Sequence, residues 1–257
     1  MKKKRKLNKK KLVLFIIMLV FFFMFLLSLI KIISYLKDNK DNKKIQETII
    51  KDSITIVEPI EEEKKVKYDI DFKSLKETNS DTVAYVKVNN TNIDYVVVKG
   101  NDNSYYLKHN FEKKWNVSGW IFADYHNNFD ESDKNIIIFG HNTRDGSMFG
   151  TLKNTLNENW YKNNENQKIV LVTEMGTYYY QVFSTYSIKP EDYYINTEFN
   201  NNDEFDKFIK KLKSRSVYDY EIEVSGKDKI LTLSSCIGDG TKRVVLHAKL
   251  IEMEENL

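Results

Sequence analysis

An almost unbroken apolar stretch near the N-terminus, residues 12–30, most constrains what this chain can form. A run of this length is sufficient to cross the hydrocarbon core of a bilayer as a helix. Eight Lys and Arg residues and no acidic residue precede it, between Lys2 and Lys11. Because positive residues mark the cytoplasmic side of membrane helices, we predict a basic cytoplasmic tail over residues 1–11, a transmembrane segment over residues 12–36 and an extracellular remainder.

The apolar stretch has the features of an uncleaved signal anchor. A secretory signal peptide has a shorter apolar core and ends in a small-residue cleavage site. Here Lys31 and Tyr35 follow the stretch, and no such site is present. We therefore predict a single-pass protein of the cell membrane, with cleavage after the stretch as the open alternative.

Residues 37–67 differ in composition from the segments on either side. They are rich in Lys, Asp, Asn and Glu with scattered isoleucines, and they include the run Glu61-Glu-Glu-Lys-Lys65. Such a composition can bury little apolar surface, so we predict a solvated and partly helical stalk. The remaining residues, 68–257, are sufficient for one extracellular domain with a substantial core.

The charge balance outside the basic tail argues against a nucleic-acid partner. The chain has 40 basic and 37 acidic residues, so removing the eight basic residues of the tail leaves 32 basic residues against 37 acidic ones. The outer part therefore lacks the basic excess that binds a phosphate backbone. Cys236 is the only cysteine, which excludes an internal disulfide, and no Cys/His cluster has zinc-site spacing. We predict neither a metal nor an organic cofactor.

Strand-like runs dominate residues 68–257. They are rich in Val, Ile, Tyr and Phe, which favour strands, and they cover residues 83–88, 93–98, 119–123, 135–139, 168–173, 177–188, 229–234 and 243–251. The first two runs flank Asn89-Asn90, which is typical of a hairpin turn. Since closure into a barrel removes exposed sheet edges, the predicted fold is mainly β, an eight-stranded barrel.

Three helices are predicted beside these strands. Asp203–Leu212 has apolar residues at helical spacing and lysines on the opposite side. Phe72–Glu77 is expected to pack beneath the barrel, and Met148–Leu156 is expected to form a third helix. We expect their apolar faces to join the core.

Three residues at the ends of predicted strands have the chemistry of nucleophilic acyl transfer. Cys236 closes the run from Leu231, Arg243 begins the next strand, and His141 follows an apolar run. The thiolate is the attacking form of cysteine, an imidazole exchanges protons with thiol and amine, and a fixed guanidinium stabilises an oxyanion. Each residue alone also fits an ordinary position in the core, in a turn or on the surface, and spacing does not pair His141 with Cys236.

Together these segments resemble the sortases, cysteine transpeptidases of Gram-positive cell surfaces. The family signature Thr-Leu-x-Thr-Cys, followed by an arginine, corresponds to residues 232–236, with Ser235 at the second threonine position. The segments 141–150 and 92–98 are similar to the class B branch, although Val96 replaces its usual proline. The helix predicted before the cysteine strand is a further class B feature.

The resemblance covers residues 69–251 and implies an eight-stranded sortase barrel with sortase B-type thiol peptidase and transpeptidase chemistry. Cys236 would cleave the sorting signal of a secreted surface protein and hold its acyl group as a thioester. His141 would protonate the leaving amine and deprotonate the incoming one, and Arg243 would bind the oxyanion or the substrate backbone. An amine of peptidoglycan or its precursor would resolve the intermediate. The substrate-binding residues implied in the same way are Asn103, Leu107, Tyr194, Ile195 and Ser234.

Some of these assignments have alternatives. Leu107 and Ile195 also fit core positions, and Asn103 fits a helix cap. Phe139 stands where the class B branch often has tyrosine, so a hydroxyl contact there is not expected.

The remaining histidines and two acids are weaker candidates. His247 lies on the same strand face as Arg243, but it also fits a core histidine with satisfied hydrogen bonds. His109 and His126 lie in polar stretches and are expected to face solvent, while Asp145 and Asp239 are candidates for electrostatic tuning.

Two other functions stay open. A thiol peptidase that only hydrolyses would use the same catalytic residues. A noncatalytic binding module would bury Cys236 in its core, and its thiol would resist alkylation.

Overall fold

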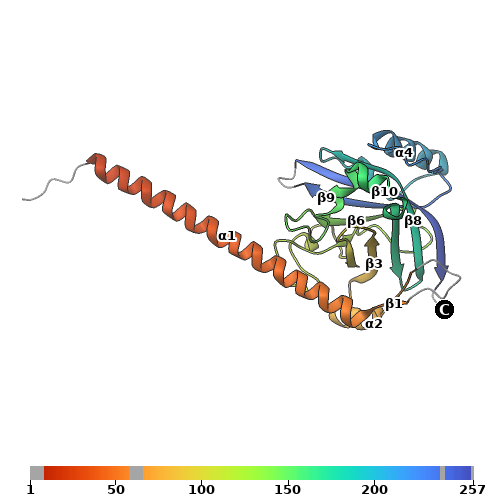
Figure 1. Ribbon diagram of the computed structural model, residues 1–257, viewed down its shortest axis with the longest axis horizontal. Coiled ribbons are helices and arrows are strands. Elements are labelled where there is room, and N and C mark those ends of the chain that lie inside the picture. Colours follow the sequence, from red (N-terminus) through yellow and green to blue (C-terminus); the bar gives the residue numbers. More distant parts are fainter. Residues whose placement is uncertain (1–8, 58–65, 238–240, 256–257) are drawn as a thin grey trace, which may run out of the picture. The chain divides into compact units, whose positions relative to one another are not determined.

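The computed structural model describes residues 9–57, 66–237 and 241–255, with the backbone alone described at Cys236 and Ile237 (Figure 1). The chain divides into two compact units, residues 1–41 and 42–257. Helix α1, Lys9–Ser53, begins in the first unit and ends in the second.

In the first unit, α1 contains the apolar stretch predicted to span the membrane. Within the described residues, α1 is the one helix long and apolar enough to cross a bilayer, and none of its most apolar window is buried. The large apolar side chains between Leu12 and Ile30 are exposed. This arrangement suits a lipid environment, although a signal sequence near an N-terminus meets the same criteria.

The second unit is built around a closed barrel of eight strands: β3 (Thr82–Val88), β4 (Asp94–Val98), β5 (Phe122–Ala123), β6 (Asn135–His141), β7 (Lys168–Thr173), β8 (Gly176–Ile188), β9 (Ile230–Ile237) and β10 (Lys242–Glu255). Their order around the barrel is β10-β8-β7-β3-β4-β5-β6-β9. The pairs β4–β5 and β6–β9 are parallel, and the other neighbours are antiparallel. The predicted eight-stranded barrel is confirmed, since each predicted run overlaps one strand.

The first hairpin forms where the sequence predicts it. β3 and β4 pair antiparallel across the turn that contains Asn89 and Asn90. Asn90 has φ 51°, a left-handed conformation that asparagine tolerates better than most residues. The turn therefore follows from local chemistry alone.

Two of the predicted helices are present with longer bounds. Helix α2 (Phe72–Thr78) begins after Asp71, whose side chain accepts a hydrogen bond from the Ser74 backbone, and it buries Phe72 and Leu75. Helix α4 (Asn202–Arg215) packs outside β8 (Figure 1). Its buried side chains are Phe205, Phe208, Ile209 and Leu212, the apolar residues that predicted it.

The third predicted helix, Met148–Leu156, is wrong at its start. Met148 has φ 49° and pairs with Asn142 in an isolated bridge, so helical structure begins only at the 3-10 helix η2 (Leu152–Leu156). A buried Met148 whose backbone N–H donates to the Tyr95 hydroxyl at 2.9 Å explains the difference. Four short elements complete the unit: η1 (Tyr105–Leu107), α3 (Glu158–Tyr161), η3 (Asn164–Gln167) and η4 (Tyr193–Ile195).

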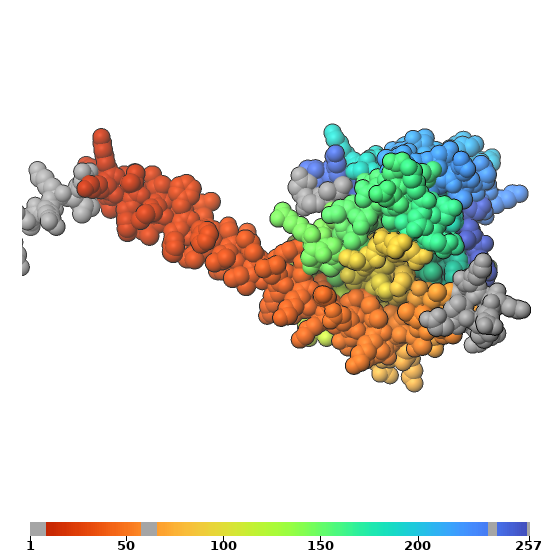
Figure 2. Space-filling view, viewed as in Figure 1, coloured from red at the N-terminus to blue at the C-terminus, as the bar shows by residue number. Residues whose placement is uncertain are grey.

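The segment predicted as a solvated stalk, residues 37–67, is partly built into the second unit. The last turns of α1 bury Asn42, Gln46, Ile49 and Ser53, which recur at helical spacing on one face. In Figure 2 this orange end of α1 lies against the surface of the barrel unit. The amino-acid composition does not predict this packed face of α1, because three of its four buried residues are polar.

A two-stranded sheet follows α1 and was also not predicted. β1 (Ile54–Val57) pairs antiparallel with β2 (Lys67–Ile70). Both strands are short, and β1 lies within the segment whose composition predicts a stalk. The compact unit therefore begins at Asn42, well before the predicted boundary at residue 68.

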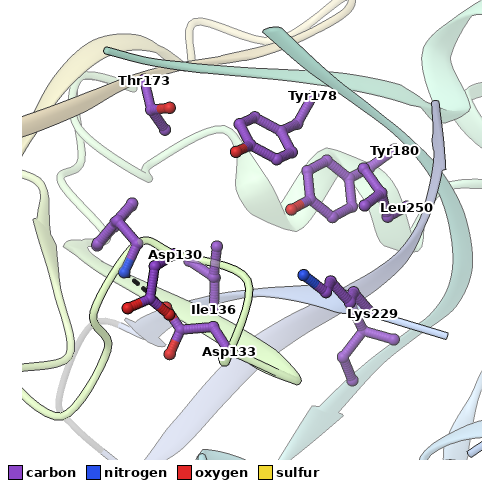
Figure 3. Close-up of a pocket in the computed structure, with 10 residues that line it drawn as sticks. Asp130, Asp133, Ile136, Thr173, Tyr178, Tyr180, Lys229 and Leu250 are labelled. Carbon is purple, nitrogen blue, oxygen red and sulfur yellow. Dashed lines mark hydrogen bonds between the residues drawn. The ribbon is translucent and has the colours of Figure 1, made fainter. Parts of the chain in front are cut away.

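The barrel interior has a continuous apolar core, and a second core fills the space between β8, β10 and α4. A small pocket lies where β6 and β9 begin, lined among others by Asp133, Tyr180 and Lys229 (Figure 3). His141 and Cys236 lie near the opposite ends of the same two strands. The pocket is therefore separate from the candidate site.

Candidate active site

Three adjacent strands align the three candidate catalytic residues in one row. In the parallel pair β6–β9, His141 is the register partner of Cys236. In the antiparallel pair β9–β10, Arg243 is the register partner of the same cysteine. Since neighbouring strands lie about 4.8 Å apart, the backbone of Cys236 has the histidine strand on one side and the arginine strand on the other.

Close packing around Gly140 determines where His141 lies. A Cβ atom on Gly140 would be 2.5 Å from Ile121 Cδ1 and 2.6 Å from Phe149 Cγ, so this approach requires glycine. The Phe149 backbone N–H donates to the His141 carbonyl at 2.9 Å. The histidine is thus held between a packed strand and a closed loop.

A backbone carbonyl determines the tautomer of His141. The His141 ring atom Nε2 lies 2.8 Å from the carbonyl oxygen of Leu107. A carbonyl oxygen only accepts hydrogen bonds, so Nε2 carries the hydrogen. Nδ1 is then the ring nitrogen left to exchange a proton, which suits a general acid and base.

A buried tyrosine orients Arg243. Arg243 Nη1 donates to the Tyr194 hydroxyl at 2.9 Å and lies 3.5 Å from the Glu191 carbonyl oxygen. Tyr194 is fully buried, and its hydroxyl lies 2.9 Å from Ser234 Oγ, two residues before Cys236 on β9. The guanidinium is therefore held next to the cysteine strand, where a cation can stabilise an oxyanion.

The residues predicted to bind substrate fall into two groups. Tyr194 and Ser234 are buried and bonded to each other, and Tyr194 also accepts a hydrogen bond from Arg243. Leu107, Ile195 and Asn103 are half-buried, which leaves part of each accessible. Leu107 also supplies the carbonyl that orients His141.

Asn103 is held by the segment that follows β5 and does not cap a helix. Its amide donates to Asp124 Oδ2 at 2.8 Å and accepts from the Tyr125 backbone N–H at 3.1 Å. The neighbouring Asp102 instead accepts from the Ser104 and Tyr105 backbone N–H groups. The helix-cap alternative is therefore wrong, and Asn103 is an anchored side chain at the surface.

His247 is the satisfied core histidine of the open alternative. It is fully buried, with Nε2 at 2.9 Å from the Tyr186 hydroxyl and Nδ1 at 2.8 Å from Thr232 Oγ1. Thr232 donates its single hydroxyl hydrogen to Asn135 Oδ1 at 2.7 Å, so His247 Nδ1 must be the donor to Thr232. Burial, with a smaller contribution from Arg215, lowers the pKa of His247 to about 3, which keeps the ring neutral.

The other candidates have local roles. His126 is nearly half exposed and contacts Asp124, as expected for a surface histidine. His109 is half-buried and stacks on Tyr105 with ring centroids 4.0 Å apart. Asp145 accepts hydrogen bonds from Ser147 in its own turn, while Asp239 lies outside the described residues.

The residues that the structure describes, 9–57, 66–237 and 241–255 without the side chains of Cys236 and Ile237, contain no group of three or more His, Cys, Asp or Glu residues arranged to hold a metal ion. The chemistry of the row is that of a thiol, an imidazole and a guanidinium. Such a set suits covalent acyl transfer.

Comparison with known proteins agrees with this assignment. The sortase domain family matches residues 86–251. The sortase B of Listeria monocytogenes is 36% identical over 186 residues, which cover 70% of this chain and 74% of that protein. The chain belongs to the sortase family, and within it to class B, so its chemistry is that of a cysteine transpeptidase.

Solved structures agree in fold. The sortase B of Bacillus anthracis in complex with AAEK1 superposes with a TM-score of 0.73 at 31% identity, covering 84% of this chain and 99% of that one. A Staphylococcus aureus sortase B–substrate complex gives a TM-score of 0.70 at 29% identity, covering 86% and 99%. The predicted sortase barrel is therefore confirmed.

Sequence reasoning missed two parts of the site. The Leu107 carbonyl has no sequence signature, because any residue supplies a carbonyl. The pairing of Tyr194 with Arg243 joins residues far apart in the chain, and only the fold brings them together. In the sequence, the one indication that Tyr194 belongs to the site is its position beside Ile195 in the loop before α4.

Proposed function

We propose that this protein is a membrane-anchored class B sortase that cleaves a C-terminal sorting signal and transfers the acyl group to an amine of peptidoglycan or its precursor. The observation that carries the proposal is the strand register that aligns His141, Cys236 and Arg243. The similarity to a sortase B–substrate complex supports a peptide substrate.

In this mechanism the Cys236 thiolate attacks the scissile carbonyl and forms a tetrahedral oxyanion. Arg243 stabilises the negative charge with its N–H donors. His141 donates a proton from Nδ1 to the leaving amine, which departs and leaves a thioester on Cys236. Nε2 keeps its hydrogen throughout, because the Leu107 carbonyl accepts from it.

The second half-reaction reverses these roles. An incoming amine attacks the thioester, and His141 Nδ1 removes its proton. The new amide bond forms as the Cys236 thiolate leaves. Water in place of the amine would give hydrolysis, so the acceptor decides between ligation and peptidase chemistry.

The N-terminal helix supports a location at the membrane. Basic residues precede the apolar stretch, and by the positive-inside rule the catalytic unit would then face outward. Asn103, Leu107 and Ile195, which are half-buried, are proposed to contact the sorting signal directly, with Tyr194 and Ser234 supporting them.

The test uses the full chain with a library of quenched sorting-signal peptides, with and without an amine acceptor. Cleavage that becomes ligation when the acceptor is added, and that is lost in Cys236→Ala, would support the proposal. Cleavage without any acceptor-dependent product would favour a hydrolytic peptidase. No cleavage together with a thiol that resists alkylation in the folded protein would favour a binding module.

A further inference from the structure

The last turns of α1 bind the loop between β4 and β5 through a buried amide pair. Asn42 Nδ2 donates to Asn116 Oδ1 at 3.2 Å, and Asn116 Nδ2 donates back to Asn42 Oδ1 at 2.9 Å. Asn42 Nδ2 also donates to the Gly119 carbonyl at 3.0 Å. Both asparagines are almost fully buried, so losing one leaves unsatisfied polar groups in the interior.

Gly119 lies directly against the carbonyl group of Leu107. A Cβ atom on Gly119 would be 2.9 Å from the Leu107 carbonyl oxygen and 2.3 Å from that of Tyr106. Gly119 also has φ +56°, a conformation that favours glycine. The adjacent Trp120 backbone N–H donates to the Tyr106 carbonyl at 3.0 Å. The backbones of Gly119 and Leu107 are therefore packed together with no space for a side chain between them, so we expect a displacement of Gly119 to move the Leu107 carbonyl.

We propose that Asn42, on α1, is a positioning residue for His141. The path has three contacts: Asn42 to the Gly119 carbonyl, Gly119 against the Leu107 carbonyl, and Leu107 to His141 Nε2. Asn42 touches no reacting atom. It holds the acceptor that orients the ring and keeps the hydrogen on Nε2. The proposal rests on the proposed catalytic role of His141.

Gln46 provides a matched control one turn further along α1. It is buried like Asn42 and also donates to a backbone carbonyl, that of Asp94 on β4. That carbonyl belongs to a barrel strand and not to the loop with Gly119 and Leu107. Gln46→Ala therefore costs packing and a hydrogen bond without touching the path to His141.

The experiment compares Asn42→Ala with Gln46→Ala in the full chain, labelled with ¹⁵N-histidine. We expect the His141 Nε2–H resonance, assigned with His141→Gln, to shift and to exchange faster with solvent in Asn42→Ala and to stay unchanged in Gln46→Ala. In peptide cleavage we expect kcat to fall about tenfold in Asn42→Ala with KM within about twofold, because the imidazole loses alignment. Asn116→Ala, which keeps the bond from Asn42 to Gly119, should have a smaller effect on the resonance.

An unchanged His141 resonance in a folded Asn42→Ala protein would overturn the proposal and leave Asn42 a structural residue like Gln46. If Asn42→Ala does not fold, Asn42→Leu decides instead, because it keeps the side-chain size, has no N–H for the Gly119 carbonyl and adds no buried charge. A shifted His141 resonance in a protein without any turnover would contradict the proposed function while supporting the positioning role. The two proposals can therefore fail separately.

Discussion

His141 and Cys236 are register partners in a parallel strand pair, although 95 positions separate them in the sequence. Parallel neighbours require a long connection between them. Here the connection contains β7, β8 and α4. β6 and β9 are neighbours in the closed barrel, so the strand that carries His141 lies beside the strand that carries Cys236.

Replacing Cys236 with alanine should abolish turnover and leave stability nearly unchanged. The nucleophile is lost, so the cleavage rate should fall at least about a thousandfold. His141→Ala and Arg243→Ala should lower kcat strongly for the same reason. Quenched-peptide cleavage and thermal melting check this. A large drop in melting temperature in all three variants would assign the residues to the core and contradict their catalytic role.

Gly140→Ala should damage both stability and activity. Its new methyl group would meet Ile121 and Phe149 at 2.5 and 2.6 Å, and such overpacking costs about 1–3 kcal/mol. The strand end that carries His141 should shift as well. Gly100→Ala is the control, since its Cβ would make ordinary contacts of 3.5 Å or more. Denaturant unfolding and peptide cleavage should separate the two variants, and equal behaviour would disprove the packing argument.

Tyr194→Phe should release Arg243 while keeping the aromatic packing. The variant removes the hydroxyl that accepts from Arg243 and contacts Ser234. A lost hydrogen bond to a charged group costs about 1.5–3 kcal/mol, and we expect kcat/KM to fall about tenfold or more. The neighbouring Tyr193, which is half-buried and lies under Lys211, is the control as Tyr193→Phe. A normal kcat/KM in Tyr194→Phe would show that Arg243 needs no such support.

His247 should make stability depend on pH. Because its pKa falls from 6.5 to about 3 on folding, the unfolded chain binds one more proton between these values. The contribution of the neutral His247 ring to the free energy of unfolding is fully present above pH 6.5. It is lost as the pH falls, by up to about 1.4 kcal/mol per pH unit.

His247→Gln should remove this part of the pH dependence. The free energy of unfolding is measured by denaturant at pH 7.5 and at pH 5.5. The difference between the two values should be smaller for the variant than for the unsubstituted protein. An identical pH dependence in His247→Gln would mean that the buried ring does not titrate on unfolding.

Removing the end of α1 should destabilise the catalytic unit. A chain that begins at residue 68 loses the buried Asn42 and Ile49 and the strand β1. Burial of one isoleucine side chain alone is worth about 1.5–3 kcal/mol. We expect its melting temperature to fall by several degrees relative to a chain that begins at Lys40. A chain that begins at Ile54 separates the helix from β1, and equal melting of all three chains would show that the helix packs without stabilising.

Local sequence patterns were sufficient for most elements. The apolar run in α1, the eight strand-like runs and the helical spacing in α4 each report on neighbouring residues, so they could be predicted without the fold. Cys236, His141 and Arg243 were singled out by their chemistry, and the family resemblance added the role expected of each. The packed face of α1 was missed because amide side chains at Asn42 and Gln46 carry no hydrophobic pattern.

The sequence by itself determined the presence of an apolar helix, the strand-rich domain and the three chemical groups of the site. Only the tertiary structure decided that His141 and Arg243 are both register partners of Cys236 and that the Leu107 carbonyl sets the histidine tautomer. It also decided that Asn42 binds the loop between β4 and β5, which contains Leu107. The reason is physical: strand register, backbone carbonyl contacts and buried amide pairs join residues distant in the chain. They depend on how the barrel closes and not on local composition.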